Sequence, residues 1–152
     1  MIHGQRSSKS LLCFGALLIT LAAFLPACSV KLISSYDEAT DKAVTALQRK
    51  TEAHLIGLEA VEGLPECKYE KHKSFYDEAK VDVSAIAVRA AAIPQNDITT
   101  ESVALLANSL GSLEKLHKIA CLSKDQIAPL RLQFNASFTA ILKLELAKRR
   151  GE

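Results

Sequence analysis

The 152-residue sequence predicts an all-α protein, specifically an up-down-up-down antiparallel four-helix bundle. Apolar residues recur at three- and four-residue steps in four successive segments of similar length, as in amphipathic helices. Short breaks separate these segments, and no segment shows the alternation of a strand. The 6 Gly and 4 Pro are too few for a β-sandwich stitched by tight turns. Four such helices joined by short connections pack antiparallel, so we expect a single bundle domain over residues 33–150.

The first two helices are expected over residues 33–62 and 66–93. Ser35 and Glu38 have the spacing of a capping box at the start of the first helix. Gly63 and Pro65 follow its end, as is typical past a helix terminus. The break Pro94-Gln95-Asn96-Asp97 ends the second helix. Its apolar stripe is Tyr69, His72, Tyr76, Ala79, Val83, Ile86, Ala90 and Ile93.

The third helix is expected from Thr99, with Ile98 placed to pack on Val103, and the fourth from near Gln126 to Arg150. Ser123-Lys124-Asp125 supplies a turn and the cap of the fourth helix. The apolar stripe of the third helix is Val103, Leu106, Leu110, Leu113, His117 and Ala120, and that of the fourth is Ile127, Leu130, Phe134, Phe138 and Ile141.

The N-terminal residues have the pattern of a secretory signal. Residues 1–10 are polar and basic, and residues 11–24 form one uncharged apolar run. Fourteen helical residues would span about 21 Å, short of the ~30 Å hydrocarbon core of a bilayer. The pattern therefore favours a signal peptide over a stable membrane-spanning helix.

The segment Leu25-Pro26-Ala27-Cys28 resembles a bacterial lipobox. The resemblance implies cleavage after Ala27, so that residues 1–27 are the lipoprotein signal peptide and Cys28 is the acylated residue. Residues 28–32 then form the lipid anchor and a short tether. Ser29, directly after Cys28, resembles the residue type that directs lipoproteins to the outer membrane. The resemblance implies that the protein is on the periplasmic face of that membrane, and the inner membrane is the alternative location. Ordinary signal cleavage beside a chance Cys, or an uncleaved anchor, is the other interpretation.

Two thiols remain in the expected mature domain, Cys67 and Cys121. They stand at helix ends that meet at one end of an antiparallel bundle. Because a periplasm is oxidising, we expect a disulfide between them. Free thiols are one alternative, and a metal site of His72, His117 and Cys121 is another, since His117 and Cys121 have the i, i+4 spacing of helical ligands.

The sequence contains no motif that indicates an enzyme or a bound cofactor. The sequence lacks a P-loop, a dinucleotide fingerprint, a nucleophile elbow and the His-Glu-x-x-His pattern. The 19 basic residues include Arg6 and Lys9 of the leader, so the remaining 17 balance the 17 acidic residues. This neutral balance gives no support to nucleic-acid binding.

The mature region also resembles a group of small uncharacterised proteobacterial lipoproteins. The resemblance is carried by Lys31-Leu32-Ile33 leading into Tyr36-Asp37, by Phe75-Tyr76, and by Phe134-Asn135-x-Ser137-Phe138. It implies a location and no reaction. Two function classes follow: a non-enzymatic binding or assembly module of the envelope, similar in architecture to pilotins, or a bundle that binds a metal or small apolar ligand near His72 and His117.

Two surfaces are candidates for contact with partners. Lys148, Arg149 and Arg150 end the last helix and are expected near lipid head groups, with helix-dipole complementarity as the alternative role. A second, uncharged stripe on the last helix carries Leu132, Leu142 and Leu146. It is expected to contact either a neighbouring helix of the bundle or an envelope protein of unknown identity.

Overall fold

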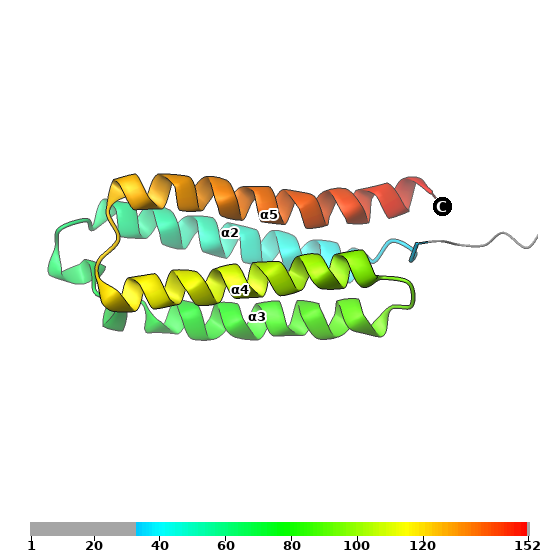
Figure 1. Ribbon diagram of the computed structural model, residues 1–152, viewed down its shortest axis with the longest axis horizontal. Helices are drawn as coiled ribbons and strands as arrows, with labels where there is room; N and C mark the ends of the chain where they lie inside the picture. Colours follow the sequence, from blue (N-terminus) through cyan, green and yellow to red (C-terminus); the bar gives the residue numbers. More distant parts are fainter. Residues whose placement is uncertain (1–32, 152) are drawn as a thin grey trace, which may run out of the picture. The chain divides into compact units, whose positions relative to one another are not determined.

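The computed structural model describes residues 33–151, which form an antiparallel four-helix bundle, as the sequence predicts (Figure 1). The helices are α2 (Glu38–Ala60), α3 (Lys73–Ala92), α4 (Asp97–Ile119) and α5 (Lys124–Arg150). Each packs on its neighbours in the order α2, α3, α4, α5, and α5 closes the ring against α2. The start of α2, the α3–α4 connection and the end of α5 lie at one end of the bundle (Figure 1). We call this the terminal end and the opposite one the disulfide end.

Helix α2 starts at Glu38, five residues later than expected, and the predicted capping box of Ser35 and Glu38 is wrong. Asp37 is the cap instead. It is extended, and its carboxylate accepts hydrogen bonds from the backbone N–H and the hydroxyl of Thr40. The same carboxylate is paired with Arg89 of α3. A residue that both caps α2 and binds a neighbouring helix therefore sets the boundary.

Helix α3 also starts later than expected, at Lys73, because residues 65–71 form two short 3₁₀ turns instead of helix. The turns are η1 (Pro65–Cys67) and η2 (Tyr69–Lys71). Gly63, at φ +75°, precedes them in a conformation that favours glycine. The tight turns bring Cys67 under the end of α4, where tertiary contacts hold it.

The last two helices start two residues earlier than expected, at Asp97 and Lys124. Ser123 caps α5 in a full capping box with Gln126. Ile98 lies in the first turn of α4 instead of before its cap, and its side chain is 59% exposed. The bundle core contains most residues of the stripes predicted for the last three helices, among them Tyr76, Ile86, Val103, Leu106, Leu113, Ile127, Phe138 and Ile141. Helix α2 adds Val44, Leu47, Leu55 and Leu58. Ala120, at the end of a predicted stripe, is exposed. Among the described helices, none combines the length and apolarity needed to cross a bilayer.

Candidate functional site

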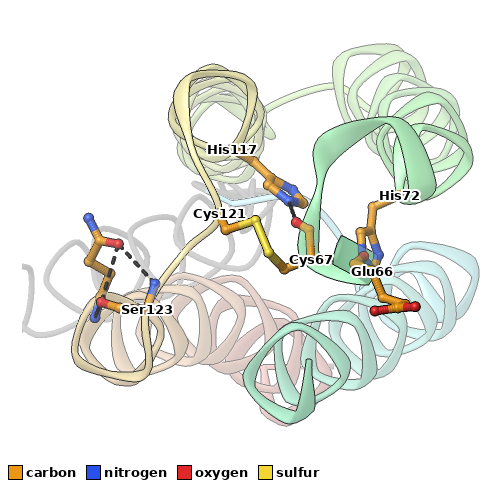
Figure 2. The surroundings of a disulfide bond; sticks show 7 residues. Glu66, Cys67, His72, His117, Cys121 and Ser123 are labelled. Carbon is orange, nitrogen blue, oxygen red and sulfur yellow. Dashed lines mark hydrogen bonds between the residues drawn. A yellow bond between two sulfur atoms is a disulfide. The ribbon is translucent and has the colours of Figure 1, made fainter. Parts of the chain in front are cut away.

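The disulfide end holds most of the candidate residues, arranged around one covalent bond. Cys67 of η1 and Cys121, just after α4, form a disulfide with their Cα atoms 5.4 Å apart (Figure 2). The prediction of this pair is confirmed. The bond joins the α2–α3 connection to the α4–α5 connection, two segments 54 residues apart in sequence.

His117 lies beside the disulfide (Figure 2). It is buried, and both of its ring nitrogens form hydrogen bonds. Nε2 lies 2.6 Å from the backbone oxygen of Cys67, which can only accept, so Nε2 carries the proton. Nδ1 then accepts from the hydroxyl of Tyr76 at 2.7 Å. Burial lowers the pKa of His117, which stabilises this neutral form.

The three residues considered for a metal site do not form one. The sulfur of Cys121 is in the disulfide, and neither nitrogen of His117 is free. Nε2 of His72 bonds the backbone oxygen of Glu66 at 2.9 Å instead. No group of three potential metal ligands occurs within residues 33–151. The sequence-based alternative of a site built from His72, His117 and Cys121 is therefore wrong.

A third histidine, His54 of α2, belongs to the same cluster and was missed by the sequence analysis. Its ring stacks on Phe75 with centroids 3.6 Å apart, and its Nε2 lies 3.4 Å from the hydroxyl of Tyr76. Burial, with His72 and His117 nearby, lowers the pKa of His54 to about 3. Its position three residues after Thr51 and four before Leu58 is the signal that places it on the apolar stripe.

The cluster is thus a chain of hydrogen bonds across three helices. His54 donates to Tyr76, Tyr76 donates to His117, and His117 donates to the backbone of Cys67. Every donor in this chain has an acceptor, and burial holds both of its histidines neutral. The arrangement positions the disulfide loop and leaves no ligand-binding nitrogen on His117.

Glu114, on α4, is buried at the edge of this cluster. Burial favours its protonated form, but Lys80, Lys118 and the hydroxyl of Tyr69 outweigh that effect and hold its pKa at about 2. The carboxylate is consequently charged and fully paired. It connects α3, η2 and α4.

A second buried polar cluster lies at the terminal end. The ammonium group of Lys148 donates to Asn96, to Thr99 and to the carboxylate of Glu145. Glu145 also accepts from the backbone N–H of Asp37 at 3.2 Å. Lys148 is 7% exposed, so the expectation that it lies near lipid head groups is wrong. Only Arg149 and Arg150 of that basic run are exposed.

The predicted partner stripe on α5 is divided between core and solvent. Leu142 packs against the core, whereas Leu132 and Leu146 are 74% and 45% exposed. Asn135, between them on the same stripe, bonds Gln48 and Glu52 of α2. The stripe therefore serves the α2–α5 contact in part and leaves two leucines in solvent. Cys28, the expected lipidation site, lies outside the described residues.

No protein-family model, curated protein or solved structure matches this chain.

Proposed function

We propose that this protein is a lipoprotein of the bacterial cell envelope, anchored through Cys28 at the periplasmic face of the outer membrane. The observation that carries this location is the Cys67–Cys121 disulfide, in a chain whose first residues resemble a lipoprotein signal. Disulfides persist in oxidising compartments, and such a signal directs the chain to one.

The tether length supports a bundle held close to its membrane. Only residues 29–32 separate Cys28 from the described bundle, a reach of about 13 Å at ~3.3 Å per residue. In this arrangement the terminal end faces the bilayer, and the exposed Arg149 and Arg150 lie on that end. Each could then contribute up to about 1 kcal/mol with anionic head groups.

The proposed role is a non-enzymatic binding or assembly module with an envelope protein as its partner. Large aliphatic side chains that the bundle leaves in solvent support this role, among them Leu132 at 74%, Leu105 at 67% and Ile119 at 82% exposed. Where exposed apolar side chains gather into a patch, that patch is typical of a protein-binding surface.

Labelling with palmitate tests the anchor. We expect label on the wild-type chain and none on Cys28→Ala; label that persists on the variant would contradict the anchor.

Crosslinking in intact envelopes, followed by affinity purification, tests the binding role. We expect the double variant Leu132→Ser with Leu146→Ser to keep its melting temperature and lose partner crosslinks. Wild-type crosslinks that the double variant retains would exclude this stripe as the partner face. A large fall in melting temperature would mean that the stripe belongs to the core.

A further inference from the structure

Ion pairs are unevenly distributed over the grooves between neighbouring helices. Lys50 bridges α2 to Glu78 and Asp82 of α3. Lys80 of α3 pairs with Glu114 of α4, and Arg131 of α5 pairs with Glu52 of α2. The α4–α5 groove has no exposed ion pair in the part of the chain that the structure describes.

The α4–α5 groove is instead hollowed and mainly apolar. Two hollows of about 260 and 290 Å³ lie along it, one at the terminal end and one nearer the disulfide end. We define the α4–α5 face by uncharged residues that line these hollows: Ile98, Leu105, Leu116, Leu130, Gln133 and Ala147. Two charged residues also line the terminal hollow, Asp97 and the buried Lys148, which is paired with Glu145.

The face exposes large aliphatic groups on α4. Ile98, Leu105 and Leu116 are 59%, 67% and 46% exposed. The hydroxyls between them are satisfied within the helix, since Ser109 donates to Leu105 and Ser112 donates to Asn108. Binding of a partner to this face would therefore leave neither serine hydroxyl without a hydrogen-bond partner.

Charged side chains border the face on both outer sides. Glu101 and Lys115 each stand seven residues from Asn108 on α4, which places them on the same side of the helix. Asp125 and Lys143 are eighteen residues apart, five full turns, and share the outer side of α5. All four are exposed, and none forms an ion pair within residues 33–151.

We propose that the α4–α5 face binds a second copy of this chain, related by a two-fold axis parallel to the bundle. Such an axis places α4 of one copy over α5 of the other, at the same height along the bundle. The hydroxyl of Thr99 contacts Glu145 at 3.2 Å, which fixes the relative heights of the two helices. By this register Glu101 is level with Lys143 of the second copy.

One pair of border charges is complementary under this symmetry. Glu101 faces Lys143 of the second copy near the terminal end, whereas Lys115 is level with Pro129, about 6 Å along the helix from Asp125. Because the interface is isologous, the Glu101–Lys143 pair occurs twice. An apolar face bordered by this repeated pair of opposite charges is complementary to itself.

The two helices are also complementary in size. At the same heights, Ile98 lies opposite Ala147 of the second copy, and Leu105 lies opposite Ala140. Large side chains on one helix over alanines on the other allow close packing of the kind found between bundle helices. The parallel axis also keeps both terminal ends on one side, so two lipid anchors can enter the same membrane.

Charge reversal tests the pairing of Glu101 with Lys143. The full-length chain is extracted in mild detergent, and its molar mass is measured by sedimentation equilibrium. We expect a wild-type dimer. Glu101→Lys and Lys143→Glu should each weaken dimerisation about tenfold, and the double variant should restore it. Asp77→Lys, an exposed reversal on α3, is the control and should have no effect. A double variant that is weaker than both singles would overturn the proposed register.

Removal of one aliphatic side chain tests the face itself. Leu105→Ser should weaken dimerisation about a hundredfold, because the symmetry removes two leucines. Val81→Ser on α3 is the matched control, since Val81 is 68% exposed and Leu105 is 67% exposed. A wild-type chain that stays monomeric, or a face occupied by a different protein, would overturn the proposal. The same measurement on the Cys28→Ala variant removes the contribution of a lipid and its bound detergent, so the dimer and the anchor can fail separately.

Discussion

At the residue scale, buried polar side chains connect the helices, and each has a partner. No buried side-chain nitrogen or oxygen in residues 33–151 lacks a hydrogen bond. The two clusters differ in charge: Lys148 and Glu145 are an ion pair at the terminal end, whereas His54 and His117 are held neutral at the disulfide end. They should therefore respond differently to mutation and to pH.

Lys148→Met should destabilise the protein by about 3 kcal/mol, because it leaves the fully buried carboxylate of Glu145 without its cation. The double variant Lys148→Met with Glu145→Leu should recover most of this loss, since it removes both charges. Urea unfolding at pH 7 measures both. Equal stability of the single variant and the wild type would contradict the burial of this pair.

His54 should make the protein less stable as the pH falls from 6.5 to 5. Its pKa is about 3 in the fold and near 6.5 in the unfolded chain, so only the unfolded chain binds a proton in this window. The loss should be about 1–2 kcal/mol and should be smaller in His54→Gln, where the remaining loss comes from His117. Glu114 does not contribute to this loss between pH 6.5 and 5. The stabilisation that comes from its lowered pKa is lost only as the pH falls from 4.5 toward about 2. Unfolding at pH 5 and pH 7 provides the comparison, and identical losses in both proteins would contradict the prediction.

At the element scale, side chains that belong to two contacts at once set the helix boundaries. Asp37 caps α2 while binding Arg89 of α3, and the Arg89 guanidinium lowers its pKa. Ser123 caps α5 through a local capping box alone. The cap of α5 was recognisable in the sequence, whereas Asp37, which caps α2 through Thr40, was not, and Asp37 also binds Arg89, 52 positions away.

Substitutions of Asp37 should separate its two roles. Asp37→Asn keeps a capping oxygen and removes the charge that binds Arg89, whereas Asp37→Ala removes both. We expect Asp37→Ala to be less stable than Asp37→Asn by about 1 kcal/mol. Denaturant unfolding measures the difference, with Ser123→Ala, expected to cost about 1 kcal/mol, as the reference for a purely local cap. Equal stabilities of the two Asp37 variants would mean that the cap contributes nothing.

At the scale of the whole molecule, the disulfide links both connections at one end of the bundle. Cross-linking residues 54 apart restricts the unfolded chain by about 4 kcal/mol on the entropic model. The terminal end has no such bond among the described residues and relies on the Lys148–Glu145 cluster.

The variant Cys67→Ser with Cys121→Ser should therefore lose about 2–4 kcal/mol of stability and remain helical. Far-ultraviolet circular dichroism with urea unfolding measures both properties. In the wild type, intact mass after alkylation should show both thiols protected until a reductant is added. Alkylation without reductant would contradict the bond.

The sequence by itself determined the four amphipathic helices, most of the core and the partner of each bundle cysteine. Helical periodicity is a local property of the sequence, and antiparallel topology places the start of the second helix and the end of the third at the same end of the bundle. The prediction that Cys67 pairs with Cys121 rested on those two facts and on the expected oxidising compartment, and the structure confirms the bond.

Only the tertiary structure decided which polar residues are buried and which apolar ones are not. Lys148 appeared to belong to an exposed basic run, but Asn96, Thr99 and Glu145 surround its ammonium group. Residues 66–72 have a helical stripe, but the disulfide and His117 hold them in 3₁₀ turns. Apart from Glu145, which is three residues before Lys148 on α5, the deciding partners are distant in sequence: Asn96 and Thr99 for Lys148, and His117 and Cys121 for Cys67. No local pattern could contain those distant partners.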